Sequence, residues 1–261
     1  MPQGVTGMND WALITGASSG IGYELAKLFA ADHINLALVA RNPMNLDRVA
    51  AELKTTYGVA TRIFARDLTD EKVPGQLCEA LHDVPVGFLV NNAGFGWRGT
   101  FVEADAAMTR SMMRVNMDAL VQLAHLFAPP MLRRRAGRIL NVASTAAFQP
   151  GPLTTIYYAT KAFVFSFSVA LAEELAGSGV TVTTLCPGAT RTEFQARAGM
   201  ERSARLLHFM KADAVARIGY RGMMAGKGIV IPGAMNKVSS MFARRLPLRF
   251  MSKIIRRINE T

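Results

Sequence analysis

Two residues in the segment IYYATKAF, at 156–163, could do chemistry together: Tyr157 and Lys161. Residues four apart share one face of a helix, so the Lys161 ammonium can lie beside the Tyr157 ring. Its positive charge favours the phenolate, and we expect the tyrosine pKa to fall from about 10 toward the working pH. The pair would then give and take a proton; the alternative is a core tyrosine with a snorkelling lysine. Tyr158 has Ala162 one turn on, so we expect a packing residue or a pocket wall.

Ser144 is a candidate for holding a substrate oxygen near this pair. It follows the apolar run GRILNVA, which is typical of a strand, and a hydroxyl at a strand's carboxyl end could hold that oxygen against Tyr157. Thr145 is the neighbouring alternative, and a serine after a strand can also be a plain turn residue. Asn116 lies in the helical stretch MMRVNMDAL, where asparagine is not a favoured interior residue.

A glycine-rich loop, TGASSGIG at 15–22, joins the first apolar run to the first helical stretch. Gly16, Gly20 and Gly22 let the backbone turn tightly, approach a phosphate and pack the helix closely. The spacing is G-x-x-x-G-x-G rather than the commoner G-x-G-x-x-G. The loop predicts a pyrophosphate site at the helix N-terminus; the alternative is an incidental strand-to-helix turn.

Charged residues follow the next two apolar runs. Arg41 ends the run LALVAR about 20 residues after the loop, where an acid would bind the 2′-hydroxyl of NAD and an arginine accommodates a 2′-phosphate. NADP(H) is therefore favoured, with a solvated arginine at a helix start as the alternative. Asp67, in RDLTD, could accept from an adenine amino group, turn the chain, or cap a helix from Asp70.

The elements that must position these residues alternate along the chain. Short apolar runs (WALIT, INLALVA, ATRIFA, VGFLV, GRILNVA, VTVTTLC and GIVIP) are separated by stretches at helical period, of which the first three are 20–31, 44–57 and 70–81. This alternation predicts an α/β fold with a doubly wound, Rossmann-like parallel sheet of about seven strands. We expect a single domain at 1–233 and a tail at 234–261.

Three motifs occur in order: TGASSGIG, NNAG at 91–94 and YYATK at 157–161. Over about residues 10 to 232 the chain resembles an ordinary-length member of the short-chain dehydrogenase/reductase family. The resemblance implies that Tyr157, Lys161, Ser144 and Asn116 are catalytic. In it, Ser144 lies thirteen residues before the tyrosine, the lysine also binds the nicotinamide ribose, and the asparagine kinks its helix and holds a water that links the lysine to solvent.

The resemblance also implies a set of cofactor-binding residues around NADP(H). They are Gly16, Ser18, Ser19, Gly20, Ile21, Gly22, Arg41, Asp67, Leu68, Asn92, Ala93, Gly94, Tyr157, Lys161, Pro187, Gly188, Thr190 and Thr192. Gly16, Ser18, Ser19 and Ile21 would cradle the pyrophosphate and the adjacent ribose. Asp67 and Leu68 would flank the adenine, and the segment 92–94 would shape the floor under the adenosine side. The last four, in PGATRT, would hold the nicotinamide and its carboxamide.

A lid at about 192–217 should cover the substrate in this family, and apolar residues could line the pocket beneath it. They are Phe194, Met200, Leu206, Leu207, Phe209 and Met210 from the lid, with Phe95, Trp97, Phe148 and Ile156 from other loops. A lipophilic ketone or aldehyde is the expected substrate. The alternative is that many of these side chains only pack the lid.

Composition limits the remaining choices. The net charge is +11, and the segment from Lys237 onward carries seven basic residues and one acid, Glu260. Its last helix could lie on an anionic bilayer, dock on a partner subunit or cover its own domain. No nucleic-acid motif accompanies the charge. The four histidines are scattered, so we predict no metal.

Two distant cysteines fit a reducing, cytoplasmic compartment, and no apolar run is expected to approach the roughly 18 residues that span a bilayer. The sequence thus predicts an NADP(H)-dependent oxidoreductase that acts on a small carbonyl or alcohol. We expect a homo-oligomer in the cytoplasm, with or without peripheral contact to a membrane. The competing hypothesis is a catalytically silent NADP-binding sensor or scaffold.

Overall fold

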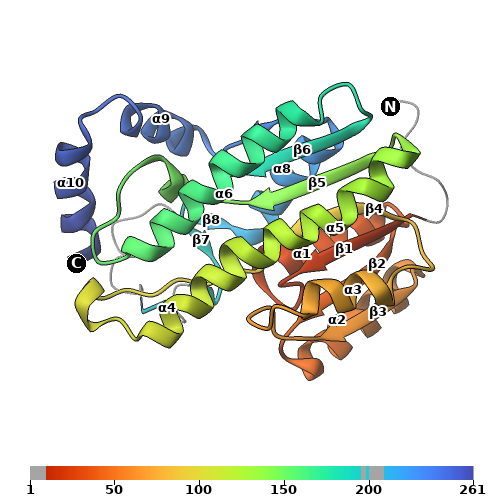
Figure 1. The fold of residues 1–261 in the computed structure, drawn as a ribbon. Helices are drawn as coiled ribbons and strands as arrows, with labels where there is room; N and C mark the ends of the chain where they lie inside the picture. The colour runs from red at the N-terminus through yellow and green to blue at the C-terminus, as the bar shows by residue number, and fades with distance from the viewer. Residues whose placement is uncertain (1–9, 195–197, 200–208, 261) are drawn as a thin grey trace.

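The computed structural model describes residues 10–194, 198–199 and 209–260. Seven strands form one parallel sheet in the order β3-β2-β1-β4-β5-β6-β9 (Figure 1). Their bounds are β1 Trp11–Thr15, β2 Asn35–Ala40, β3 Thr61–Ala65, β4 Val86–Asn91, β5 Gly137–Val142, β6 Val180–Leu185 and β9 Ile229–Val230. The predicted doubly wound parallel sheet is confirmed.

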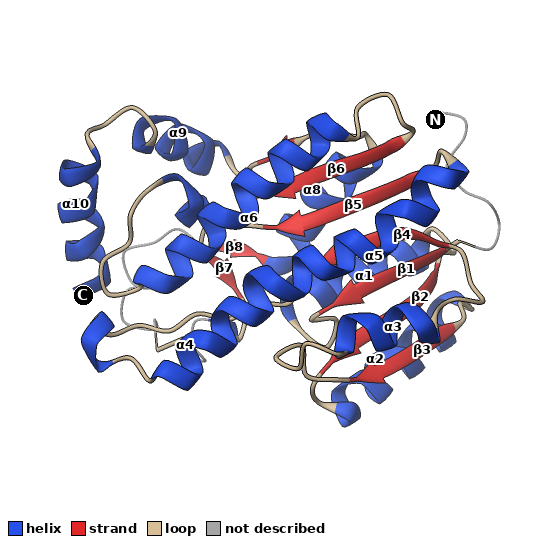
Figure 2. Cartoon of the chain, viewed as in Figure 1, coloured by secondary structure: helices blue, strands red, loops and turns tan. Residues whose placement is uncertain are grey.

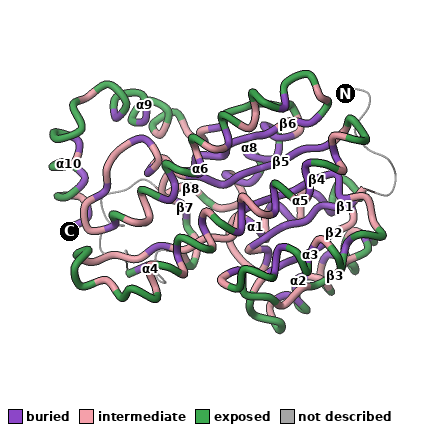
Figure 3. Tube along the Cα trace, in the orientation of Figure 1, coloured by how far each residue is buried: buried purple, intermediate pink, exposed green. Residues whose placement is uncertain are grey.

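Helices cover both faces of the sheet (Figure 2). One core lies beneath α1 (Gly20–Ala31), α2 (Pro43–Tyr57) and α8 (Ala212–Met224); the other lies beneath α3 (Val73–Ala80), α5 (Ala119–Arg134) and α6 (Thr155–Glu174). Side chains alternate between these cores along each strand, so Ile14 packs in the first and Leu13 in the second. The inner strands β1, β2, β4, β5 and β6 are accordingly almost entirely buried, whereas the edge strand β3 is only partly covered (Figure 3).

The first two helices match their predicted ranges closely, whereas the third is shorter than 70–81. The Asp70 carboxylate accepts a hydrogen bond from the Lys72 amide at 2.9 Å, and the Asp70 amide donates to the Asp67 carbonyl. These contacts hold a turn, and α3 starts only at Val73 with a proline in its first turn.

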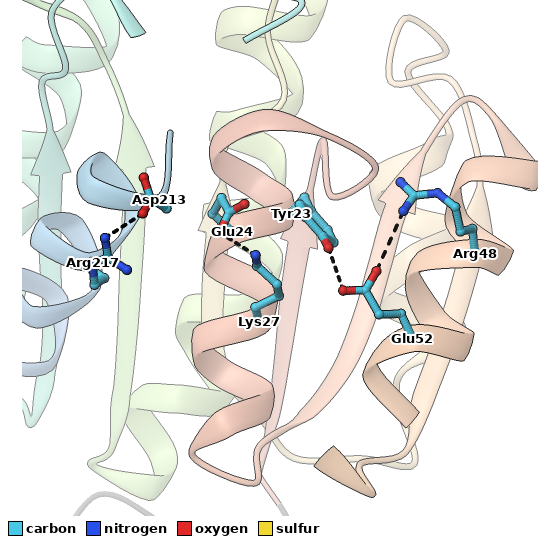
Figure 4. A network of polar contacts seen from close by, with 7 residues as sticks. All are labelled: Tyr23, Glu24, Lys27, Arg48, Glu52, Asp213 and Arg217. Carbon is cyan, nitrogen blue, oxygen red and sulfur yellow. Dashed lines mark hydrogen bonds and ion pairs between the residues drawn. The ribbon is translucent and has the colours of Figure 1, made fainter. Parts of the chain in front are cut away.

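Polar contacts tie α1 to α2 on the outer surface of this helix layer (Figure 4). The Tyr23 hydroxyl donates to Glu52 at 2.6 Å, and Arg48 pairs with the same carboxylate at 3.7 Å. Lys27 pairs with Glu24 at 2.8 Å on α1. These groups are partly exposed, so they orient the helix pair and contribute little to stability.

Short elements gather beyond the carboxyl ends of the strands. They are η1 (Phe101–Glu103), α4 (Ala106–Met113), the π-helical turn η2 (Arg114–Asp118), η3 (Thr145–Phe148) and the two-stranded sheet of β7 (Thr190–Arg191) and β8 (Met210–Lys211). Ligands of doubly wound sheets bind at this edge. The predicted site residues should therefore meet here.

The tail forms two helices, α9 (Ala234–Ala243) and α10 (Leu248–Glu260), at the same end of the molecule (Figure 1). Ala243, Met251 and Ile255 are buried in a third cluster with residues of η3 and α6. Asn259 donates to the Pro152 carbonyl at 2.8 Å and to the Thr154 hydroxyl at 3.1 Å. Of the three alternatives for the tail, contact with its own domain is therefore observed.

Helix α6 corrects one expectation about apolar runs. Its 20 residues are long and apolar enough to cross a membrane by length and composition. In the structure, however, α6 packs on the sheet: Val164 and Ser168 are buried, and the Asn141 side chain of β5 donates to the Ser168 hydroxyl at 2.9 Å. One face of α6 is buried on the sheet, and the outer face also carries apolar side chains, because Phe163 and Val169 are exposed.

Candidate active site

The glycine-rich loop turns between β1 and α1 with two glycines in the left-handed region. Gly16 has φ +67° and Gly20 has φ +58°, a conformation that L side chains rarely adopt. A Cβ at Gly22 would clash with the Gly16 carbonyl oxygen, so glycine is required for α1 to start this close to the loop. Ser19 is the N-cap, but its side chain does not cap the helix. The first amides of α1 therefore remain available to an anionic group.

Thr15 and Asn92 fix the shape of this loop. The Asn92 side-chain amide donates to the carbonyl oxygens of Thr15 and Gly16 at 2.9 and 3.2 Å. The backbone amides of Asn92 and Ala93 both donate to the Thr15 hydroxyl at 3.0 Å. The end of β4 thus braces the loop, and the Asn92 side chain itself faces the loop backbone.

The segment PGATRT reaches the same loop from the end of β6. A Cβ on Gly20 would lie 3.0 Å from the Thr192 methyl group, which places Thr192 directly against the loop. Thr190 is buried, and its hydroxyl donates to the Gly188 carbonyl at 2.9 Å. The Pro187 carbonyl accepts from the Thr145 amide at 2.9 Å, which ties this segment to η3.

Arg41 and Asp67 lie at the ends of β2 and β3, and both are exposed. The Asp67 carboxylate accepts from the Thr69 amide at 3.0 Å, so the alternative in which it turns the chain is observed. Leu68 is only 7% exposed and packs in the core beneath α3. Its side chain therefore contributes to the core, and only its backbone remains to flank an adenine.

Asn116 lies at the point where α4 continues into α5 through the π-helical turn η2. It is buried, and its side chain accepts from the Phe95 amide and donates to the Phe95 carbonyl, both at 3.0 Å. It also donates to the Thr160 hydroxyl at 3.0 Å, which in turn donates to the Tyr157 carbonyl at 2.7 Å. One asparagine thus links the helix distortion, the loop after β4 and the tyrosine-bearing turn of α6.

Lys161 is buried beside Tyr157, as the i, i+4 spacing predicts. Its Nζ lies 5.9 Å from the centre of the Tyr157 ring and donates to the Val142 carbonyl at 2.8 Å. A Cβ on Gly94 would approach Nζ to 3.5 Å, so the NNAG segment passes close to the lysine. The lysine is held among apolar residues by a backbone oxygen of β5.

Ser144 lies just past the end of β5, opposite the Tyr157 turn. Its hydroxyl accepts from the Ala146 amide at 3.1 Å and donates over a long 3.4 Å to the Pro187 carbonyl. A bond of that length is weak, so the hydroxyl can be turned toward another acceptor. Ser144 and Tyr157 interact closely enough for the serine to favour the phenolate.

The predicted fall in the Tyr157 pKa is wrong for this structure. Burial raises the pKa of Tyr157 to about 12, and the hydrogen bond with Ser144 opposes this only in part. Burial also lowers the pKa of Lys161 to about 8. Desolvation disfavours the charged form of each group and is the largest cause of both shifts. At neutral pH the tyrosine is therefore a proton donor beside a lysine that still carries most of its charge.

Tyr158 points away from this chemistry. Its ring packs on Gly151 and belongs to the third cluster, with α10 beneath it. Burial raises the Tyr158 pKa, whereas hydrogen bonds with Asn259 and Gln149 lower it. The interpretation of Tyr158 as a packing residue agrees with this placement.

Apolar side chains lie on two sides of Tyr157. Phe194 packs against its ring with a centroid distance of 5.3 Å. A shallow pocket that opens to solvent adjoins the first turn of α6. Its lining is Trp97, Gly99, Phe101, Ala104, Thr109, Met112, Thr155 and Ile156.

The other expected pocket residues have different places. Phe148 is buried in the third cluster, and Met210 packs against the core beneath α1 and α8. Phe95 binds Asn116 through its backbone, and Phe209 is half-buried just before β8. Met200, Leu206 and Leu207 lie outside the described residues. Among the described residues, no group of three or more His, Cys, Asp or Glu side chains could hold a metal ion.

Thr160 and Arg66 are two residues that sequence reasoning did not select. Thr160 connects Asn116 to Tyr157. Its position inside YYATK, three residues after the tyrosine, could have indicated this role. The Arg66 amide donates to the Ala40 carbonyl at 3.0 Å, so Arg66 stands next to Arg41 at the sheet edge. Only the pairing of β2 with β3 makes these two arginines neighbours.

A doubly wound parallel sheet with a glycine-rich loop after its first strand defines a dinucleotide-binding α/β protein. The model of the short chain dehydrogenase family matches residues 10–203. The chain belongs to the short-chain dehydrogenase/reductase family, as its motifs indicated.

Known relatives extend this result. The chain is 34% identical over 185 residues to a human very-long-chain 3-oxoacyl-CoA reductase, a match that covers 69% of this chain and 59% of the human protein. The chain thus spans about three fifths of that relative's length. A short-chain dehydrogenase from Sphingobium yanoikuyae in complex with NADPH shares 35% identity, with a TM-score of 0.81 over 90% of this chain and 93% of that one. A bulky-bulky ketone specific alcohol dehydrogenase from Comamonas testosteroni shares 32% identity, with a TM-score of 0.78 over 90% and 92% of the two chains.

Proposed function

We propose that the protein is an NADP(H)-dependent oxidoreductase that interconverts a lipophilic ketone or aldehyde and its alcohol. The observation that carries this proposal is the meeting of Tyr157, Lys161 and Ser144 beside the glycine-rich loop at one edge of the sheet. A silent sensor would bind a dinucleotide through the loop alone and has no chemical need for this group. Relatives that bind NADPH or act on bulky ketones support the same reaction class.

Bound NADPH would supply the hydride in the reducing direction. As the substrate oxygen gains negative charge, the Tyr157 hydroxyl donates its proton to that oxygen, and Ser144 donates a hydrogen bond to it. Lys161 stabilises the phenolate that Tyr157 becomes. Asn116 and Thr160 hold the Tyr157 turn of α6 in position through their hydrogen bonds.

The substrate class can be tested with NADPH and a panel of ketones and aldehydes of increasing apolar bulk. Carbonyls with a large apolar group should have the highest kcat/KM, because Trp97, Phe101 and Ile156 line an apolar pocket at the first turn of α6, the helix that carries Tyr157. The measurement is NADPH oxidation followed by absorbance. Turnover of none of the panel would contradict the proposed activity, and a preference for short polar carbonyls would contradict the substrate class.

We propose that Arg41 and Arg66 bind the 2′-phosphate of the cofactor together. Arg41→Asp should raise the KM for NADPH by roughly 10- to 100-fold, because an ionised hydrogen bond contributes about 1.5–3 kcal/mol. The KM for NADH should change little or fall. Arg66→Ala should act in the same direction with a smaller effect.

Lys54→Asp is the matched control for Arg41→Asp. Lys54 is also an exposed cation, and it lies near the end of α2, the helix that follows β2. It should leave the ratio of the two KM values unchanged. If Arg41→Asp also leaves that ratio unchanged, the phosphate role is wrong.

We further propose a homo-oligomer, a dimer or a tetramer, that works in the cytoplasm at a membrane surface. The outer face of α6 supports self-association, because Phe163 and Val169 are about two fifths exposed and Phe163 stacks on Phe167. Both cysteines are unpaired, which fits a reducing compartment. A monomer in analytical ultracentrifugation at micromolar concentration would contradict the oligomer.

A further inference from the structure

The tail helices expose large apolar side chains in an unusual concentration. Of the sixteen large hydrophobic residues that are exposed in the described part of the chain, seven lie between 235 and 254. We call these seven the outer apolar surface: Met235, Val238, Met241, Phe242, Leu248, Phe250 and Ile254. Met235 is 72% exposed and Leu248 is 66% exposed. Exposed apolar side chains gathered on neighbouring segments in this way are typical of an interaction site.

Helix α9 has its hydrophobic face on the outside. Met235, Val238 and Phe242 follow the i, i+3, i+7 spacing of one helical stripe, and all three are exposed. The inward side carries the small residues Ser240 and Ala243, which are buried. A helix that only covers its own domain would bury its large apolar side chains. The exposed apolar stripe of α9 therefore suits an apolar environment outside the domain.

Helix α10 divides its apolar residues between two directions. Met251 and Ile255 are buried against the domain, whereas Phe250 and Ile254, one turn apart, are 54% and 36% exposed. The apolar part of α10 is therefore wider than the contact with the domain requires. Helices α9 and α10 lie at the same end of the molecule (Figure 3), so both present exposed apolar side chains at that end.

Basic residues surround the outer apolar surface. Lys237, Arg245, Arg249 and Lys253 are exposed, and Glu260 is the only acid after residue 236. Glu260 pairs with Arg256 at 2.7 Å on α10. The segment therefore presents apolar side chains within a field of positive charge, which complements an anionic lipid headgroup layer.

We propose that α9 and α10 dock the protein on the surface of an anionic bilayer. A second copy of this chain is a poorer occupant, because a two-fold contact would bring these cations against their own symmetry mates. The helices have 10 and 13 residues, which at 1.5 Å per residue is roughly 15–20 Å and too short to span the hydrocarbon core. They therefore lie in the interface, with the outer apolar surface among the acyl chains.

Docking in this orientation places the apolar pocket beside the membrane. Asn259 of α10 binds the loop at Pro152 and Thr154, and the same loop accepts from the Gly99 amide through Leu153 at 2.8 Å. Gly99 and Phe101 line the pocket, and Phe101 and Val102 are 61% and 89% exposed. This part of the inference rests on the proposed function: a lipophilic carbonyl dissolved in the bilayer would reach Tyr157 without crossing water.

Vesicle co-sedimentation of the full chain tests the docking directly. The wild type should bind vesicles that contain phosphatidylglycerol, bind phosphatidylcholine vesicles far more weakly, and lose affinity as salt rises. The triple variant Met235→Ser, Val238→Ser, Phe242→Ser and the triple variant Arg245→Glu, Arg249→Glu, Lys253→Glu should each weaken binding at least about tenfold. All six residues are exposed, so both variants should keep the wild-type melting temperature.

Two control variants match these changes elsewhere on the surface. Met44→Ser, Ile63→Ser, Ile218→Ser removes the same number of exposed apolar side chains, and Lys54→Glu, Lys72→Glu, Lys227→Glu reverses the same number of charges. Both controls should bind phosphatidylglycerol vesicles within about twofold of the wild type. Weakening by the charge control equal to that of the tail variant would overturn docking through the tail.

Tryptophan fluorescence reports the orientation, because the chain has two tryptophans at opposite ends of the sheet. Trp97 lines the pocket, and Trp11 starts β1 at the amino edge. Vesicles that carry brominated acyl chains should quench the Trp11→Phe variant, which retains Trp97, and leave the Trp97→Phe variant nearly unchanged. Equal quenching of the two variants, or quenching of Trp11 alone, would overturn the orientation.

Negligible binding of the wild type to phosphatidylglycerol vesicles, or undiminished binding of both triple variants, would overturn the docking proposal. So would a wild-type oligomer that dissociates when Met235, Val238 and Phe242 are replaced by serine, because a second copy would then occupy the outer apolar surface. Turnover of a water-soluble carbonyl is measured separately and should be the same for wild type and both triples. Vesicle binding without any turnover would contradict the proposed function and leave the docking intact, so the two failures are distinguishable.

Discussion

Tyr157→Phe should lower kcat for NADPH-dependent carbonyl reduction by about 10²- to 10⁴-fold, the range over which a positioned acid or base contributes to catalysis. The change removes one hydroxyl and leaves the ring, so the contacts with Phe194 and Tyr158 persist. The Kd for NADPH, measured by fluorescence, should stay within a few-fold of the wild-type value. The loss should therefore appear in kcat and not in cofactor binding.

Tyr158→Phe is the matched control, because it removes the same atom from the next residue on the same helix. Its hydroxyl interacts with Asn259 and Gln149 in the third cluster. Activity should remain within a few-fold of wild type, and the melting temperature should fall slightly, since a buried hydrogen bond is lost. Retained turnover in Tyr157→Phe, or an equal loss in the two variants, would show that Tyr157 is not the proton donor.

Lys161→Met should reduce kcat/KM at least about a hundredfold while leaving the protein no less stable than the wild type. The lysine is 5% exposed and has one backbone partner, Val142, so its charge is expensive to bury. A methionine of similar length fills the same space without that cost. The measurements are NADPH oxidation and thermal unfolding at pH 7. A large fall in melting temperature would mean that the lysine stabilises the fold rather than the reaction.

The same lysine should set the alkaline limit of the reaction. Burial holds its pKa at about 8, below the ordinary lysine value, so it loses its positive charge as pH rises through that range. Without that charge the phenolate of Tyr157 is less stable, and kcat/KM for reduction should fall above about pH 8. In Lys161→Met this fall should be absent. An alkaline limb that survives in the variant would assign the titration to another group.

Raising the pH through the pKa of Lys161 should have the opposite effect on stability: it should stabilise the folded chain while it lowers kcat/KM. Between about pH 8 and the unfolded lysine value near 10.4, the unfolded chain binds more protons at this residue than the folded chain. This residue therefore contributes a rise in stability with pH across that window. The melting temperature of the wild type should rise relative to that of Lys161→Met as pH increases from 8 to 10. This measurement separates the stability effect from the catalytic one.

Much of the fold could be predicted because its determinants are local and periodic. The apolar runs alternate with helical stretches, and their side chains divide between two cores in the observed sheet. The start of α1 follows from glycines that no other residue can replace, since Gly16 has positive φ and Gly22 abuts a carbonyl. The start of α3 was missed because short aspartate side chains compete for backbone amides over two or three residues.

The pairing of Tyr157 rather than Tyr158 with Lys161 was determined by the sequence itself. Helical spacing fixes which side chains share a face, whatever the helix packs against. The basic character of the tail was equally plain, because charge is a property of composition.

Only the tertiary structure determined the pKa values, the contacts and the orientation of these residues. The pKa of Tyr157 rises rather than falls, because desolvation depends on every neighbour and not on the residue four positions away. Asn116 meets Thr160, and Arg66 meets Arg41, across loops and strands that sequence spacing does not relate. Helix α9 buries Ser240 and Ala243 against the domain and leaves its large apolar residues exposed. Periodicity identifies a helix face, but the direction of that face depends on the packing of the whole chain.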